Sequence, residues 1–314
     1  MTAPDSPRCG WSLPDLPGIA VVGASGLVGT ALVDVLHQRN FPHRSLRSVA
    51  VRSFEASQLS DADLIFLAAP HALARTAIPA LRRPGRIMID LSDAWRLDPE
   101  VPLVLAGVND AAVMNHSGLI ASPNCTNVGL VVALHALSGT IEVPRATVTS
   151  MQAASGGGRR MLEHLQEPNL EDPTTLSGNL LPQCDVLLED GRSAEEQRLQ
   201  VESTRLLGEA MPLLEATCVR VPVEVGHALA LTLHCSREVS LEEVLNALDR
   251  HPDIHRAESG SFPTPVQVRG KEGVFVGRVR HGSDAKTVQM WIVIDNLLTG
   301  AATNAVRIAE QLLP

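Results

Sequence analysis

A cysteine, a histidine and a glutamine stand in contexts that suit covalent chemistry at a carbonyl carbon. Cys125 lies in ASPNCTN, just before the apolar run 128–137, which predicts a helix. A helix N-terminus lowers the pKa of a thiol and raises the fraction of nucleophilic thiolate. His227 is a candidate base, and Gln152 precedes a glycine-rich turn that is typical of close approach to a ligand. A buried structural cysteine or histidine is the alternative for each reactive group.

Three arginines are candidates for binding an anion. Arg220 precedes His227 in CVRVPVEVGH, and Arg96 and Arg198 lie in otherwise polar segments, where an exposed surface charge is the alternative. The chain carries a net charge of -9, so an anion site has to be built locally from arginines or helix N-termini. The same charge argues against a nucleic-acid partner, which requires a basic surface.

A glycine-rich loop in VVGASGLVG points to a dinucleotide. Gly23, Gly26 and Gly29 stand between a predicted strand and a predicted helix, where glycine lets the backbone approach a phosphate. Arg52 and Ser53 follow the next predicted strand, at the place where an acidic residue would hold the ribose of NAD. An arginine there favours the 2′-phosphate of NADP. A simple turn and an exposed arginine are the alternatives.

Alternating strands and helices predict a parallel sheet in the first part of the chain. The predicted strands are 18–22, 45–51, 62–69, 85–92 and 118–123, with helices at 26–39 and 72–83. The pattern then changes to α+β. Longer strands are predicted in 145–155, 216–225 and 228–236, an antiparallel pair in 274–282 and 287–296, and helices at 241–251 and 300–314.

Composition places the chain among globular proteins. Its 314 residues, 45% of them hydrophobic and 19% charged, suffice for two domains. Five cysteines without paired spacing predict free thiols in a reducing compartment, and no CxxC pattern suggests a metal, so none is expected. No signal peptide and no apolar run of about 18 residues is present, so the expected location is the cytoplasm, without a membrane partner.

Several fragments together resemble the aspartate-semialdehyde dehydrogenase family. The most specific are SPNCTN, QAASGGG, NLLPQCDVLLEDG, CVRVPVEVGH and DNLLTGAATNAVRIAE. The resemblance implies that Cys125 is the acyl-accepting nucleophile, that His227 is the acid/base catalyst and that Gln152 orients the thioester. It implies that Arg220 binds the α-carboxylate of the substrate in a bidentate manner.

The resemblance also implies the remaining site residues and the architecture. Substrate or phosphate contacts are expected from Glu195, Arg96, Asn124 and Arg198. Cofactor contacts are expected from Gly23, Ser25, Gly26, Leu27, Val28, Arg52, Ser53, Ser155, Gly156 and Asn296. The fold would be a Rossmann-like dinucleotide-binding domain plus an α+β catalytic and dimerisation domain. The expected boundaries are a flexible leader 1–17, a first domain 18–127 to which 297–314 returns, and a second domain 128–296.

The implied reaction is the reductive dephosphorylation of L-aspartyl 4-phosphate to the semialdehyde and phosphate through a cysteine thioester. NADP is the expected cofactor, with NAD as the alternative, and the partners are the acyl phosphate, phosphate and a second copy of the chain, in a homodimer or homotetramer.

The sequence departs from the family pattern at several positions. Arg198 replaces a lysine, Ala106-Gly107 replaces Pro-Glu, Ala228 replaces a common serine, and the segment after Arg52 is short. These departures indicate a divergent member. They leave two alternatives open: a paralogous reductase of another acyl phosphate or an acyl-CoA, and a non-catalytic paralogue.

Overall fold

The computed structural model describes residues 12–166, 169 and 171–314. Most of the predicted leader, including Cys9, lies outside the described residues. The chain divides into two compact units, Met1–Pro123 with Ala301–Pro314, and Asn124–Gly300. The divisions thus fall after residues 123 and 300, whereas the sequence predicts them after residues 127 and 296. Each unit is described by itself.

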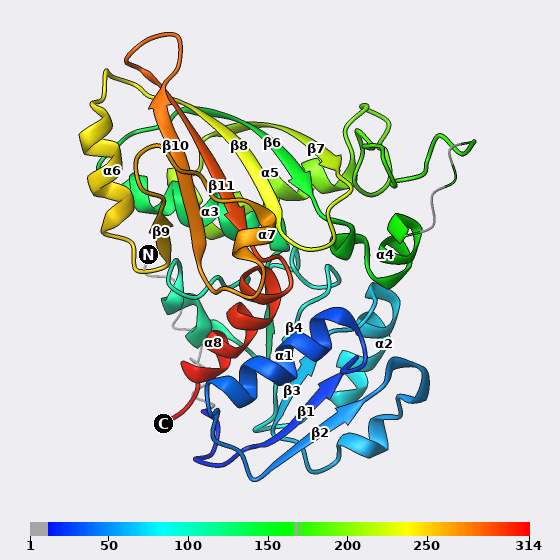
Figure 1. Ribbon diagram of the computed structural model, residues 1–314. Helices are drawn as coiled ribbons and strands as arrows, with labels where there is room; N and C mark the ends of the chain where they lie inside the picture. The colour runs from blue at the N-terminus through cyan, green and yellow to red at the C-terminus, as the bar shows by residue number, and fades with distance from the viewer. Residues whose placement is uncertain (1–11, 167–168, 170) are drawn as a thin grey trace. The chain divides into compact units, whose positions relative to one another are not determined.

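The first unit is built on a parallel sheet, as predicted (Figure 1). Within the described residues its five strands run in the order β2-β1-β3-β4-β5, and every neighbouring pair is parallel. The strands are β1 Gly18–Val22, β2 Ser45–Val49, β3 Leu64–Leu67, β4 Ile87–Asp90 and β5 Leu119–Ala121. The helices are α1 Leu27–Gln38, α2 His71–Leu81 and α8 Asn304–Glu310, with short 3₁₀ turns at Val51–Ser53, Ala56–Leu59 and Asp110–Asn115.

Two segments of this unit differ from the sequence prediction. The strand predicted to reach residue 51 ends at Val49, and a 3₁₀ turn carries Arg52 instead. The helix predicted from residue 300 begins as a π-helical segment, Leu298–Thr303, before α8. Helix α8 packs with α1, where Arg39 and Glu310 form an ion pair of 2.7 Å.

The glycine-rich turn between β1 and α1 needs glycine for steric reasons. Gly23 has φ +87°, and a Cβ there would lie 2.1 Å from the Ala68 carbonyl oxygen at the end of β3. A Cβ on Gly29 would lie 2.1 Å from the Gly23 carbonyl oxygen. The turn therefore packs tightly on the sheet and leads directly into α1. Among the described residues, no side chain caps the N-terminus of this helix at Gly26.

The second unit is built on a mixed sheet, in agreement with the predicted α+β region. Over the part of the chain that the structure describes, its six strands run in the order β7-β6-β8-β11-β10-β9. They are β6 Arg145–Gln152, β7 Leu213–Arg220, β8 His227–His234, β9 Ile254–Arg256, β10 Val274–His281 and β11 Thr287–Ile294. Strands β10 and β11 form the predicted antiparallel pair, while β6–β7 and β9–β10 are parallel.

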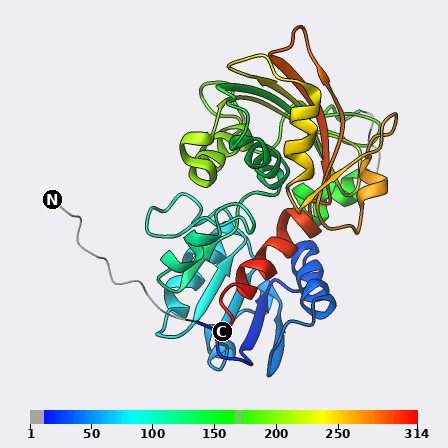
Figure 2. The same cartoon turned by 90° about the vertical axis from the view of Figure 1, so that its left-hand side faces the viewer.

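Helices cover one face of the second sheet (Figure 2). They are α3 Cys125–Ser138, α5 Ala194–Leu207 and α6 Leu241–Asp249, and the shorter elements are α4 Arg159–Gln166, α7 Pro265–Val268, and 3₁₀ turns at Ala154–Gly157 and Gly208–Ala210. The strand residues beneath the helices, such as Val148, Leu231 and Ile292, are fully buried. Their neighbours on the opposite face, such as Thr232 and Trp291, are only half-buried.

The sequence prediction for this unit differs from the structure in the bounds of one strand and in two helices. The strand predicted over 216–225 runs from Leu213 to Arg220, because Pro222 has no N–H to continue the ladder. Helices α4 and α5 were not predicted. No helix within the described residues is long and apolar enough to cross a membrane.

Candidate active site

Cys125 is the first residue of helix α3, so the predicted start of this helix at residue 128 was wrong. Asn124 is the N-cap, and its side-chain oxygen accepts a 2.8 Å hydrogen bond from the backbone N–H of Thr126. The thiol therefore lies in the first turn of a 14-residue helix, where the helix dipole favours an anion. This placement strengthens the reading of Cys125 as a thiolate nucleophile.

Cys125 and His227 form a close pair. The thiol sulfur lies 3.3 Å from His227 Nε2, and His227 is fully buried at the start of β8. The other ring nitrogen, Nδ1, accepts a 3.1 Å hydrogen bond from the backbone N–H of Ala153. Burial and the positive charge of Arg220 lower the pKa of His227 to about 3. The imidazole beside the sulfur is therefore uncharged at neutral pH.

Two glycines let the backbone approach this pair. A Cβ on Gly156 would lie 2.7 Å from Arg220 Nη1 and 3.0 Å from His227 Cε1. A Cβ on Gly300 would lie 2.8 Å from the Cβ of Cys125. Any larger residue at either position would therefore overlap Cys125, His227 or Arg220 unless these side chains moved. Gly156 was expected at the site from the sequence, whereas Gly300 was not.

Arg220 ends β7 beside Gln152, its partner in β6. The side chain is buried, with 8% of its surface exposed, and its Nη1 donates a 2.9 Å hydrogen bond to the Ala153 carbonyl oxygen. Among the described residues this is the one hydrogen bond of the guanidinium, and no carboxylate pairs with it. A buried guanidinium without an anionic partner is costly, so this fork is suited to the carboxylate of a ligand.

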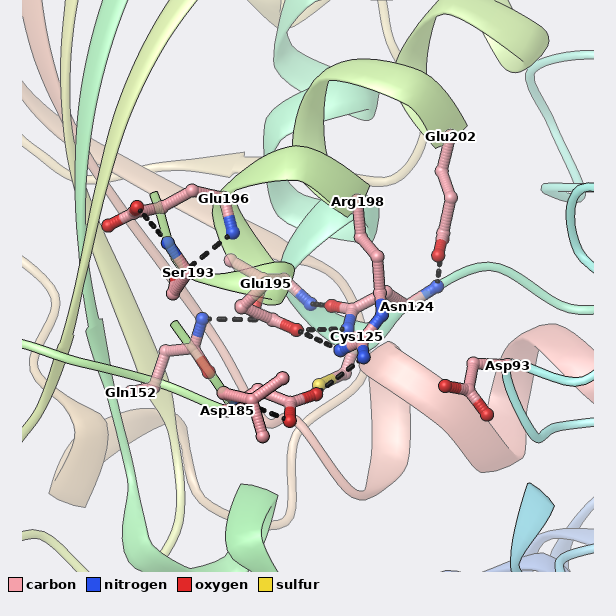
Figure 3. Close-up of polar contacts among 12 residues, drawn as sticks. Asp93, Asn124, Cys125, Gln152, Asp185, Ser193, Glu195, Glu196, Arg198 and Glu202 are labelled. Atoms are coloured by element: carbon pink, nitrogen blue, oxygen red, sulfur yellow. Dashed lines mark hydrogen bonds and ion pairs between the residues drawn. The ribbon is translucent and has the colours of Figure 1, made fainter. Parts of the chain in front are cut away.

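Glu195, near the start of α5, connects several of the predicted residues (Figure 3). Its Oε1 accepts hydrogen bonds from the Gln152 amide at 3.0 Å and the Thr126 hydroxyl at 3.2 Å. Its Oε2 accepts from the Asn124 amide at 2.9 Å and from Arg198 Nη1 at 3.2 Å. The buried carboxylate therefore orients the side-chain amides of both Gln152 and Asn124.

Arg198 is shared between two carboxylates. Besides Glu195, it forms an ion pair with Asp185, which lies in the left-handed region with φ +68°. Its side chain is 23% exposed, so a ligand can reach it. An incoming phosphate would compete with these carboxylates for the guanidinium.

Two predicted cofactor residues of this unit, Ser155 and Asn296, are buried and bonded to each other. The Asn296 amide nitrogen donates to the Ser155 hydroxyl at 3.0 Å, and its oxygen accepts the backbone N–H of Gly226 at 2.8 Å. Gly226 has φ +104° and immediately precedes His227. Asn296 thus fixes the turn that places the imidazole of His227.

The other predicted site residues lie in the first unit. They are Gly23, Ser25, Gly26, Leu27 and Val28 on the β1–α1 turn, Arg52 and Ser53 on an exposed 3₁₀ turn, and Arg96. Arg96 is buried after β4, where its guanidinium donates 2.9 Å hydrogen bonds to the carbonyl oxygens of Ser122 and Leu91.

Glu202 is a site residue that the sequence analysis missed. Its side chain is buried, with 1% exposed, and its Oε2 accepts the Asn124 backbone N–H at 2.7 Å and the Asn127 amide at 3.3 Å. It lies two helical turns after Glu195, on the same face of α5. In the sequence, this spacing from Glu195 was the signal that could have pointed to Glu202. Glu202 holds the backbone immediately before the nucleophile.

We expect Glu202→Ala to lower the free energy of unfolding by about 1–3 kcal/mol, because the Asn124 N–H loses its buried acceptor. The loosened loop should also lower kcat. Glu202→Gln keeps an acceptor oxygen and should recover most of both losses. Urea denaturation and steady-state kinetics measure these effects. Glu196→Gln is the matched control on α5, because Glu196 accepts backbone N–H groups of Ser193 and Cys218 instead. Equal losses in the alanine and glutamine variants would contradict the assignment.

Two family models match the chain. Residues 43–116 match the NAD-binding domain of semialdehyde dehydrogenases, and residues 134–299 match the semialdehyde dehydrogenase dimerisation domain. Both matches agree with the two units described above.

Individual relatives agree with these models. The aspartate-semialdehyde dehydrogenase of Aquifex aeolicus is 33% identical, covering 94% of this chain and 97% of its own. That of Prochlorococcus marinus is 33% identical, covering 96% and 97%. Among solved structures, aspartate semialdehyde dehydrogenase II of Vibrio cholerae complexed with ASA has a TM-score of 0.87 at 29% identity, covering 95% and 98%. A probable aspartate-semialdehyde dehydrogenase of Pseudomonas aeruginosa has a TM-score of 0.86 at 32% identity, covering the same shares of the two chains. The chain therefore belongs to the aspartate-semialdehyde dehydrogenase family.

Proposed function

We propose that this protein catalyses the NADP-dependent reductive dephosphorylation of L-aspartyl 4-phosphate to L-aspartate 4-semialdehyde and phosphate. One observation gives the main support for a substrate with an α-carboxylate. The guanidinium of Arg220 is buried, and among the described residues it has no anionic partner. It lies beside the Cys125–His227 pair, so a bound α-carboxylate would be held close to the thiol. Family membership supports the same substrate.

The thiol of Cys125 supplies the covalent step. Its thiolate attacks the acyl carbon, the C–S bond forms, and the carbonyl electrons move onto oxygen. When the carbonyl re-forms, the C–O bond to the phosphoryl group breaks and phosphate leaves. Gln152 and Asn124, both held by Glu195, would orient the thioester and the leaving phosphate. Arg198 would offset the charge of that phosphate, and Arg96 stays a predicted phosphate ligand in the first unit.

The residues of the first unit fit a nicotinamide dinucleotide. The tight glycine turn and the N-terminus of α1, which no described side chain caps, offer backbone N–H groups to a pyrophosphate. Arg52, exposed after β2, would bind the 2′-phosphate and so favour NADP over NAD. Ser155, Gly156 and Asn296 stay predicted contacts of the nicotinamide end. When bound, the cofactor supplies the hydride that reduces the thioester.

The reverse reaction tests the proposal. Purified protein is incubated with aspartate semialdehyde and phosphate, and reduction of NADP or NAD is followed by absorbance. We expect phosphate-dependent turnover that is faster with NADP. Forward rates on aspartyl phosphate, glutamyl phosphate and malonyl-CoA separate a paralogous reductase from the proposed enzyme. Absence of turnover with both cofactors, together with failure to bind NADPH or NADH, would identify a non-catalytic paralogue.

We propose further that the protein assembles as a homodimer through the open face of the second sheet. Half-buried side chains on this face, including Met151, Phe275 and Trp291, pack against a small cluster that includes Val268 of the short α7 and remain partly exposed. The matched dimerisation domain supports this assignment. Light scattering should give twice the chain mass, or four times for a pair of dimers. Ala230→Arg, on the same face, should give monomers. A monomeric wild-type protein would contradict the proposal. The cytoplasmic location stays a prediction.

A further inference from the structure

The guanidinium of Arg198 on helix α5 is held by a carboxylate at each end of its fork (Figure 3). Its Nη1 donates a 3.2 Å hydrogen bond to Glu195 Oε2, and its Nη2 donates to Asp185 Oδ2. A guanidinium offers separate N–H groups in a rigid plane, whereas the ammonium of a lysine is one compact charge. Arg198, where the family pattern has a lysine, is therefore suited to engage both carboxylates at once.

The two carboxylates differ in how firmly they are fixed. Glu195 is buried and accepts hydrogen bonds from three other side chains besides that of Arg198. The Asp185 side chain is 37% exposed, and its Oδ1 accepts a 2.7 Å bond from the backbone N–H of Val186, the next residue in the chain. Within the described residues, the pair with Arg198 is the contact that joins the Asp185 side chain to the site. Asp185 is thus the exchangeable partner of Arg198.

The turn around Asp185 is closed by bonds that do not involve its carboxylate. Its carbonyl oxygen accepts a 2.7 Å bond from the Gln183 amide. The segment that follows is tied to the start of α5, where the Ala194 N–H donates to the Val186 carbonyl oxygen at 2.8 Å. Asp185 itself has φ +68°, a conformation that asparagine adopts as readily as aspartate. The carboxylate can therefore leave Arg198, or be replaced by an amide, without loss of these bonds.

We propose that Asp185 is an internal competitor for phosphate: its carboxylate gives up Nη2 of Arg198 to the phosphate group of a ligand and takes that nitrogen back when phosphate leaves. The proposal rests on the proposed function for the assignment of Arg198 as a phosphate ligand. It extends that function because it makes Asp185 the residue that sets the affinity for phosphate and promotes its release.

Charge favours exchange over simultaneous binding. Two carboxylates already face one guanidinium, and a phosphate that joined both of them would add further negative charge at short range, where like charges repel. Displacement of Asp185 removes one of these charges from the guanidinium. A partly exposed ion pair contributes little, so giving it up changes a binding constant by about fivefold at most. Phosphate can therefore displace Asp185, yet it binds less tightly than it would without this competitor.

Phosphate binding, measured without turnover, tests the proposal. The thermal unfolding midpoint is followed against inorganic phosphate at constant ionic strength, and the dissociation constant follows from the stabilisation by the bound ligand. We expect Asp185→Asn to bind phosphate roughly three- to tenfold more tightly than wild type, because the uncharged amide competes and repels less. In an Arg198→Gln background, the same substitution should change the dissociation constant less than about twofold, since the competed group is gone.

Asp190→Asn is the matched control for the loss of a negative charge. Asp190 lies in the same segment and is 49% exposed, but it pairs with Arg192 instead of Arg198. Its dissociation constant for phosphate should stay within about twofold of wild type, as for other surface substitutions. An equal gain in Asp190→Asn would mean that net charge alone causes the effect. Unchanged or weaker binding in Asp185→Asn would mean that Asp185 does not compete. Either result overturns the proposal.

Kinetics distinguish this proposal from the proposed function. In the reverse reaction, the KM for phosphate should fall in Asp185→Asn by the same factor as the dissociation constant, while the KM for aspartate semialdehyde stays unchanged. In the forward reaction, inhibition by added phosphate should become tighter to match. If the binding results hold but wild type shows no turnover, the proposed reaction is wrong and the competitor role stands. If wild type turns over and the KM for phosphate does not fall in Asp185→Asn, the competitor role alone is wrong.

Discussion

Replacing Cys125 by serine is expected to lower kcat at least about 10⁴-fold, because the proposed covalent step depends on the thiol of Cys125. The first turn of α3 favours an anion, so it favours the thiolate form of a cysteine, whereas a serine hydroxyl in the same place is a far weaker acid. An ester would also be a poorer hydride acceptor than the thioester it replaces.

The Cys125→Ser experiment has a matched control in Cys235→Ser. Cys235 is also a free thiol in the second unit, but it is buried at the end of β8 and burial raises its pKa. This control should retain wild-type kcat, and both variants should bind NADPH as wild type does in a fluorescence titration. Mass spectrometry of protein quenched during turnover should show an acyl adduct on the peptide that contains Cys125. Activity of Cys125→Ser within tenfold of wild type would exclude the thioester mechanism.

The sheets could be predicted from the sequence because their strands are apolar in regular patterns. In the first unit, β1, β3, β4 and β5 are buried along their whole length, whereas the edge strand β2 is mostly exposed. In the second unit, strands such as β6 alternate between a buried and a half-buried face. The start of α3 could not be predicted in this way. Its first turn is made of polar residues that bond to α5, so apolar periodicity begins only at Val128.

Helix α5 was missed for a related reason. Much of its sequence, AEEQRLQVESTRLL, is charged or polar, and two of its glutamates are buried at the site instead of apolar side chains. The capping box formed by Ser193 and Glu196 was a readable signal for its first residue. The roles of Glu195 and Glu202 depend on which amides reach them across the fold, and no spacing in a single sequence specifies that.

The resemblance to the family identified the candidate residues, but the contacts between these residues depend on the three-dimensional structure. In the sequence Gly300 looks like an ordinary glycine at the start of the predicted C-terminal helix, but in the structure a Cβ there would lie 2.8 Å from the Cβ of Cys125. The ring of His227 is held by a hydrogen bond from the backbone N–H of Ala153, which lies on a different strand-to-turn segment. Such contacts join elements far apart in the chain, so they are visible only after folding.

Arg220→Lys is expected to raise the KM for aspartate semialdehyde by roughly 10- to 150-fold, which corresponds to about 1.5–3 kcal/mol for a hydrogen bond to a charged group. Lysine keeps the positive charge but presents a single ammonium in place of a planar fork. It also loses the bond from Nη1 to the Ala153 carbonyl oxygen, which aims the guanidinium. Arg145→Lys is the control, because Arg145 pairs with Glu215 on the exposed part of β6.

A substrate without the α-carboxylate makes the Arg220 prediction specific. If the guanidinium binds that carboxylate, 3-aminopropanal gains nothing from it, so kcat/KM for 3-aminopropanal should be alike in wild type and Arg220→Lys. The loss of kcat/KM should appear only with aspartate semialdehyde. The guanidinium of Arg220 and the ring of His227 both lie close to Gly156. If the lysine instead disturbed His227, kcat/KM would fall equally for both aldehydes. An equal loss on the two aldehydes would therefore remove Arg220 from the substrate site and, with it, the main structural support for an α-carboxylate substrate.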